Sequence, residues 1–148
     1  MHDMSKYSPA EFIPGVLYFQ GDRSPNNAQR EHEGYSSSWL HHKGRNKHHY
    51  EYWCDNFDQG TDPIKMPFNY ALELICDYLA ANKAYSGDGS IDSEIEWWKI
   101  KKQHCKMHPH TISLVTGIFN HMKIYGIENT LKDSNYIKIL KIWYESQY

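Results

Sequence analysis

Two histidine pairs, His41-His42 and His48-His49, lie seven positions apart and are flanked by aromatic residues. Imidazole nitrogens and carboxylate oxygens bind first-row transition metals, and hydrolytic metal sites combine them while keeping a position open for water. Adjacent side chains point in different directions, so we expect at most one histidine of each pair to bind an ion and the other to orient it or meet substrate. The candidate metal ligands in the chain are His2, Asp3, His41, His42, His48, His49 and Asp77.

Two basic residues lie near these candidates: Lys6 follows the His2-Asp3 dyad, and Arg45 lies between the histidine pairs. Both are candidates to hold a phosphate, Arg45 as a two-pronged donor and Lys6 as a point charge. The alternative for both is ordinary surface charge. The histidines also have an alternative role that involves no metal. A lone histidine is usually a packed residue of the interior or an ordinary residue of the surface.

The elements that must position these residues follow from turn and periodicity signals. Residues 44–47, Gly-Arg-Asn-Lys, interrupt a helix that starts within 35–40, so we expect the histidine pairs on either side of a turn. The clearest helix covers residues 67–85. Its apolar stripe consists of Phe68, Leu72, Ile75 and Leu79. Asp77 falls on roughly the opposite side of a helix that its neighbours enclose, so its carboxylate needs a reason to be there.

The rest of the chain also has helical signals. Ser8, Pro9 and Glu11 predict the start of a short helix, with Ser8 as N-cap and Glu11 closing a capping box. Asp92 or Ser93 is expected to cap a later helix. Further helical segments are predicted at 28–33, from about 93 to 106, at 111–125 and at 135–148. There is no strand alternation and no repeat, so the predicted class is all-α, with one helical domain over residues 1–148.

Composition limits the classes of function. A chain of 148 residues with 15% aromatic residues can fill one core. Its formal net charge of −2 gives no global electrostatic reason to bind nucleic acid, which is not an expected partner. Three cysteines without CxxC spacing predict reduced thiols in a cytoplasmic protein. No apolar run approaches the roughly 20 residues that span a bilayer.

The helix that contains Asp77 resembles the last metal-binding helix of HD-domain phosphohydrolases. In several branches, notably the cyclic-dinucleotide phosphodiesterases, an Asp is followed by Leu, a basic residue and Tyr; Asp77, Leu79, Lys83 and Tyr85 fit that spacing. The His2-Asp3 dyad is similar to the one that names the superfamily. The resemblance implies a compact HD-like helical fold, a divalent ion (Mn, Fe, Zn or Ni), and a nucleotide or another phosphate ester as substrate.

More of the chain, residues 1 to about 115, resembles a functionally uncharacterised bacterial and phage family. The segments that carry this resemblance are 2–12, 39–49 and 66–85. HD-domain proteins have an earlier histidine on a helix before the dyad, so the resemblance implies an N-terminal helix that this sequence, beginning at Met1, lacks. A start codon placed too late, a truncated chain and a degenerate member are the three explanations.

Two functions follow from these patterns. The first is a metal-dependent phosphohydrolase in which a spare histidine moves protons near neutral pH and a small phosphorylated molecule is the partner. The second is a non-catalytic helical module that binds metal or another ligand. Both leave the oligomeric state open, a homodimer included.

Overall fold

The chain is built from helices. The computed structural model describes residues 2–85 and 87–147, and that part of the chain contains no strand, which confirms the all-α class. The 3-10 helices are η1 (Met4–Tyr7), η2 (Tyr50–Trp53) and η3 (Phe57–Gln59). The α-helices are α1 (Pro9–Leu17), α2 (Pro25–Glu33), α3 (Ser37–Lys43), α4 (Phe68–Tyr85), α5 (Ile91–His104), α6 (Pro109–Tyr125), α7 (Ile127–Lys132) and α8 (Ser134–Ser146). None of the described helices is long and apolar enough to cross a bilayer.

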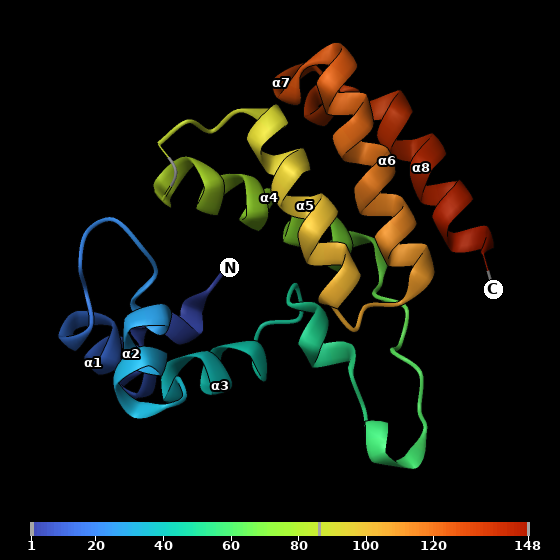
Figure 1. The fold of residues 1–148 in the computed structure, drawn as a ribbon. Coiled ribbons are helices and arrows are strands. Elements are labelled where there is room, and N and C mark those ends of the chain that lie inside the picture. The colour runs from blue at the N-terminus through green and yellow to red at the C-terminus, as the bar shows by residue number, and fades with distance from the viewer. Residues whose placement is uncertain (1, 86, 148) are drawn as a thin grey trace.

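The helices form two groups (Figure 1). Helices α1, α2 and α3 lie together, and α4 to α8 make a larger bundle in which α6 packs against α4, α5, α7 and α8. The N-terminal end of the chain lies between the two groups. There His2 forms ion pairs with Glu73 and Asp77 of α4, so the start of the chain joins one group to the other.

The apolar core lies in the larger group. Its largest fully buried apolar side chains are Met66, Leu74, Ile75, Trp98, Leu114, Ile118, Phe119, Met122 and Tyr144. The Tyr144 hydroxyl donates a 2.7 Å hydrogen bond to the Met66 carbonyl, which satisfies its polar end inside the core. This core fixes α4, and with it Asp77, on a rigid support.

The smaller group has a polar interior. Among the described residues before Met66, Ala28 is the one apolar side chain classed as buried. The buried polar side chains there are Asp3, Glu11, Gln29, Ser36, Ser38, His42, His48 and His49. Between α2 and α3, the Ser36 and Ser38 hydroxyls donate to Gln29 Oε1 at 2.9 and 3.1 Å. Hydrogen bonds between buried side chains therefore contribute much of the packing within this smaller group.

Helix α4 closely follows its predicted range. Of the predicted stripe, Phe68 and Ile75 are buried in the core, while Leu72 and Leu79 are half-buried against it. The Asp77 side chain is 24% exposed and points to His2 rather than into the core. The expectation that Asp77 lies apart from the apolar stripe is confirmed.

Two predicted helix caps are wrong. Ser8 makes no side-chain cap on α1, and Glu11 binds histidines instead of closing a capping box. Helix α5 is capped by Ser90, whose hydroxyl accepts from the Ser93 backbone N–H at 3.2 Å, and not by Asp92 or Ser93. An N-cap needs extended backbone, and Ser90 has it.

Candidate metal centre

The two histidine pairs lie on either side of a turn, as predicted. His42 is in the last turn of α3, and His48 and His49 follow the turn. Asn46 makes this turn: its side-chain amide donates to the His42 carbonyl at 2.8 Å, and its own carbonyl accepts from the His49 N–H at 3.1 Å. The turn therefore brings the imidazole of α3 back against those of the second pair.

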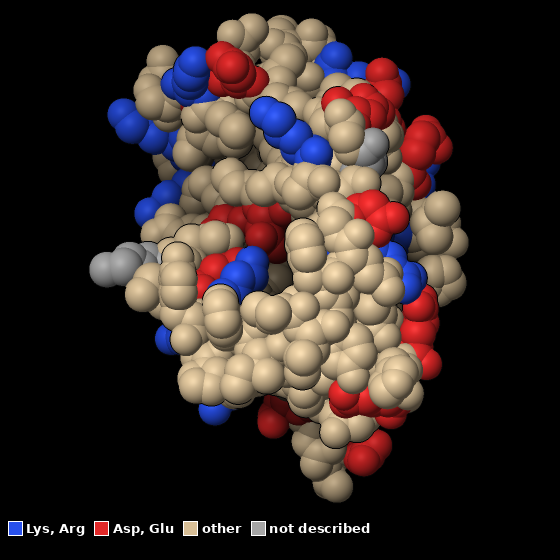
Figure 2. All heavy atoms as spheres, turned by 90° about the vertical axis from the view of Figure 1, so that its left-hand side faces the viewer, with Lys and Arg blue, Asp and Glu red and all other residues tan. Residues whose placement is uncertain are grey.

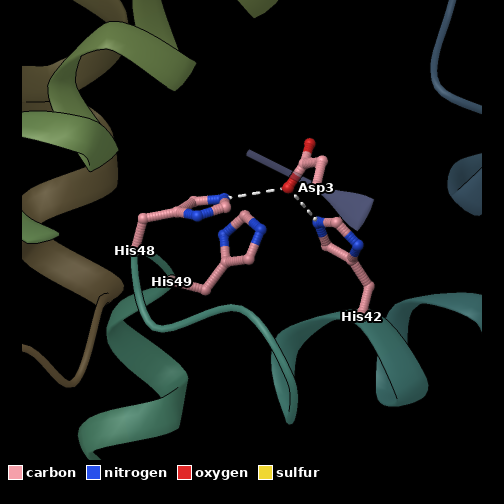
Figure 3. Close-up of side chains that lie close together, drawn as sticks. All are labelled: Asp3, His42, His48 and His49. Carbon is pink, nitrogen blue, oxygen red and sulfur yellow. Dashed lines mark ion pairs between the residues drawn. The ribbon is translucent and has the colours of Figure 1, made fainter. Parts of the chain in front are cut away.

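Three imidazoles surround the carboxylate of Asp3 (Figure 3). Asp3 Oδ1 lies 3.4 Å from His42 Nε2 and 3.3 Å from His48 Nε2, and one ligand atom from each of these residues and from His49 lies within 4.8 Å of every other. Ligands at about 2.1 Å from a tetrahedral ion stand about 3.4 Å from one another. The spacing in this inner group therefore suits one divalent ion.

Three atoms of the inner group have no hydrogen-bond partner among the described residues. They are Asp3 Oδ1, His48 Nε2 and His49 Nε2, and all are inaccessible to solvent. Buried polar atoms without partners destabilise a fold by about 1–3 kcal/mol each, so native proteins rarely keep them without a reason. A cation in contact with these lone pairs supplies that reason, and the residues present fit a metal.

Glu11 of α1 orients the first histidine pair. Its Oε2 accepts from His42 Nδ1 at 2.7 Å and its Oε1 from His41 Nδ1 at 2.6 Å. With the proton of His42 held on Nδ1, Nε2 presents its lone pair to Asp3, as in the carboxylate–histidine–metal arrangement. His41 lies outside both groups of candidate ligands and shares Glu11 instead.

A second, outer group lies towards solvent. It consists of His2, Asp3, His48 and Asp77, again with ligand atoms within 4.8 Å of one another. The His2 Nε2 atom is 3.2 Å from Asp3 Oδ2 and 3.5 Å from Asp77 Oδ1, and the His2 Nδ1 hydrogen bonds to Glu73 at 2.8 Å. Figure 2 shows a hollow in this face with acidic side chains inside and a basic one beside them.

The imidazoles differ in their readiness to take up a proton. Burial, with help from neighbouring His48 and His42, lowers the pKa of His49 to about 3, and burial lowers the pKa of His48 too, although Asp3 acts against it. Both rings are therefore neutral near pH 7, the form that binds metals. Burial also acts to lower the pKa of His2, but the hydrogen bond with Glu73 and the charge of Asp3 raise it overall.

Asp3 has an unusual backbone. Its φ of 54° and ψ of 29° lie in the left-handed region, and it is the one described non-glycine residue with positive φ. Such a conformation is strained by roughly 1 kcal/mol or more, and strained residues cluster at functional sites. Lys6, one turn later in η1, forms a 2.5 Å ion pair with Asp3 Oδ2. Burial acts to raise the pKa of Asp3, but Lys6 and the neighbouring histidines lower it overall.

The structure thus brings together most of the residues predicted for the site. His2, Asp3, His42, His48, His49 and Asp77 meet in the two groups, with Lys6 beside them. Both histidines of the second pair take part, although the sequence predicts at most one. Arg45 is exposed and donates to the His41 carbonyl at 3.3 Å; among the described residues it makes no hydrogen bond or ion pair with the candidate ligands.

Glu11 is a site residue that sequence reasoning does not assign, whereas Glu73 is recognised from the sequence as a neighbour of Asp77 but is given no role. The spacing of Glu11 predicts a capping box, and Glu73 is one more polar residue one turn before Asp77. The sequence signal for Glu73 is its position, because Glu73 and Asp77 are four residues apart and share a side of α4.

Comparison with known proteins identifies a family without assigning a reaction. No curated protein matches the chain. No solved structure matches it either. One family model, described as a family of unknown function (DUF5662), matches residues 1–121, a span that contains both candidate ligand groups. The chain therefore belongs to the DUF5662 family.

Proposed function

We propose that the chain is a metal-dependent phosphohydrolase that acts on a nucleotide or another phosphate ester. The observation that carries this proposal is the pair of ligand groups that share Asp3 and His48, one buried and one facing solvent. Asp3 contributes a different oxygen to each, Oδ1 towards His42 and His48 and Oδ2 towards His2. A hydrolytic centre needs a side that water can reach, and the outer group, which includes the exposed His2, supplies that side.

The residues have distinct roles in this proposal. Asp3, His42, His48 and His49 hold a divalent ion such as Mn, Fe, Zn or Ni. A bound ion supplies Lewis acidity, which activates water and polarises a phosphoryl oxygen. His2 and Asp77 complete the solvent-facing side.

Lys6 supplies positive charge at the same place. Its ammonium group contacts Asp3 Oδ2, and its side chain is 61% exposed, so it can turn to a phosphate oxygen. The raised pKa of His2, to which Glu73 and Asp3 contribute against burial, makes His2 a proton carrier near neutral pH.

The resemblance to HD-domain phosphohydrolases supports the same reaction class. The order of His2-Asp3, the histidine pairs and Asp77 in the sequence matches that superfamily, and these residues meet in space. A resemblance alone does not assign a reaction, so the proposal rests on the chemistry of these residues.

One observation favours a second candidate function, a helical module that binds metal without turnover. The Lys6 ammonium ion pairs with Asp3 Oδ2, the oxygen that the outer group would use. The Lys6 ammonium therefore occupies the place at Asp3 Oδ2 that a second metal ion would otherwise take.

Metal analysis and hydrolysis assays of the purified full-length chain test both candidates. We expect divalent metal by mass spectrometry and metal-dependent hydrolysis of p-nitrophenyl phosphate or bis(p-nitrophenyl) phosphate. Metal without hydrolysis of either ester, or of a panel of nucleotides, supports the binding module. A chain that retains no metal after purification and reloading overturns both.

A further inference from the structure

A cavity of about 300 Å³ lies between the C-terminal half of α4 and the start of α5. Its walls include three aromatic residues, Tyr78, Tyr85 and Trp97. The rings of Tyr78 and Trp97 meet edge to face, with centroids 4.9 Å apart. Cavities of this size with aromatic walls and a few polar groups are typical of small-molecule sites.

A buried polar atom of the lining residues has no hydrogen-bond partner among the described residues. Glu94 is 2% exposed; its Oε2 accepts from the Asn82 side-chain amide at 2.8 Å, whereas its Oε1 has no such partner within that part of the chain. An unpaired buried carboxylate oxygen is costly, which points to a ligand that donates to it. The last torsion of a glutamate is soft, so a small rotation turns Oε1 towards the cavity.

The cavity and the metal centre share helix α4 as a wall. Asp77, Ala81 and Tyr85 are spaced by four residues, so a stripe runs from a candidate metal ligand to the cavity wall, which contains Ala81 and Tyr85. At 1.5 Å per residue, Ala81 and Tyr85 of the wall lie about 6 Å and about 12 Å from Asp77 along the helix axis.

We propose that this cavity binds the amino-substituted base of a nucleoside phosphate, whose phosphate reaches the metal centre along α4. The ring packs against Tyr78 and Trp97, and the exocyclic amine donates to Glu94 Oε1. An aliphatic chain would leave the Glu94 oxygen unpaired, which is why we choose a base. The phosphate end of this proposal rests on the proposed function, whereas the base site stands by itself.

Nucleosides, which lack the phosphate, test the base site separately from the metal. Adenosine, guanosine and cytidine are titrated into the full-length chain in the presence of EDTA, with tryptophan fluorescence and calorimetry as readouts. We expect at least one of them to bind at millimolar concentration or below. Purine riboside is adenosine without the exocyclic amine. If adenosine is the preferred nucleoside, purine riboside should bind roughly tenfold more weakly.

Variants place the binding in the cavity. Trp97→Ala should lose most of the affinity and the fluorescence change, whereas Trp143→Ala should keep both; the two tryptophans are 42% and 40% exposed, so they are matched in accessibility. Glu94→Gln should reduce the discrimination between a base and its amine-free analogue. Circular dichroism confirms that each variant is folded.

The outcomes separate the two proposals. Failure of all three nucleosides to bind, or equal binding by the Trp97→Ala and Trp143→Ala variants, overturns the base site even when metal and hydrolysis are found. Nucleoside binding in a chain that holds no metal and hydrolyses no ester supports the base site and overturns the hydrolase.

Discussion

Glu11 Oε2 accepts a 2.7 Å hydrogen bond from Nδ1 of His42, 31 positions further along the chain. This contact fixes the tautomer and the direction of a ring whose other nitrogen faces Asp3. An outer carboxylate of this kind raises the basicity of the ligand it holds.

Replacing Glu11 by Gln should therefore weaken metal binding by roughly 10- to 100-fold. The amide oxygen of Gln can still accept the hydrogen bond from the His42 ring, but it lacks the negative charge of the Glu11 carboxylate. Competition with a chromophoric chelator measures the affinity. Glu128→Gln, at an exposed glutamate paired with Lys132, is the matched control and should leave it unchanged. Equal affinities for the two variants would mean that Glu11 is a packing residue alone.

His48 and Asp77 should differ in their importance for the metal. His48 belongs to both ligand groups, whereas Asp77 belongs to the outer one alone. We expect His48→Ala to retain no metal and Asp77→Ala to retain a reduced amount, measured by mass spectrometry after gel filtration. His104→Ala, at an exposed histidine of α5, controls for the loss of any imidazole and should match the parent chain. Parent-like retention in His48→Ala would refute the site.

Glu94 should make the stability of the protein depend on pH. Burial raises the pKa of Glu94 above its usual 4.5, and the bond from Asn82 offsets part of that rise. The unfolded chain then holds fewer protons than the folded one between the two pKa values, so this contribution is complete below pH 4.5 and is lost as the pH rises through the folded pKa.

A Glu94→Gln variant removes this loss. Its free energy of unfolding, relative to that of the parent chain, should rise between pH 4 and pH 7, because the variant has no buried carboxyl group at this position to ionise over that range. Urea titrations of chelator-treated protein measure it. Glu128→Gln should show no such trend, and a pH-independent difference for Glu94→Gln would contradict the prediction.

Removing the metal should loosen the smaller group of helices and spare the larger. Residues before Met66 bury polar side chains, several of them candidate ligands, while the apolar core comes from Met66 onwards. Metal binding to a site that joins such a group adds directly to its stability. Hydrogen exchange with and without chelator should therefore show faster exchange in α1 and α3 and little change in α6. Uniform acceleration in both groups would argue against it.

The sequence predicts what local signals control. The turn at 44–47 and helix α4 can be predicted because glycine, helix periodicity and helix-starting proline act over a few residues. The convergence of the histidine pairs with Asp77 is a hypothesis drawn from residue chemistry, and the structure brings them together through Asp3 and His48.

Long-range contacts explain what the sequence does not predict. Glu11 fits a capping box by spacing, but it is drawn to histidines of α3, because bonds to two imidazoles satisfy a buried carboxylate better than one backbone N–H. Both His48 and His49 reach the inner group because they follow a turn, where neighbouring side chains can converge. Neither outcome has a signature within ten residues.

The division between a polar half and an apolar half sets an order of events during synthesis. The ribosome releases Asp3, His42, His48 and His49 before the segment from Met66 to Tyr144 that forms the rigid bundle. Asp77 is held in place by that later segment. The inner group of candidate ligands is therefore synthesised first, and the outer group is completed only when α4 brings Asp77 to it.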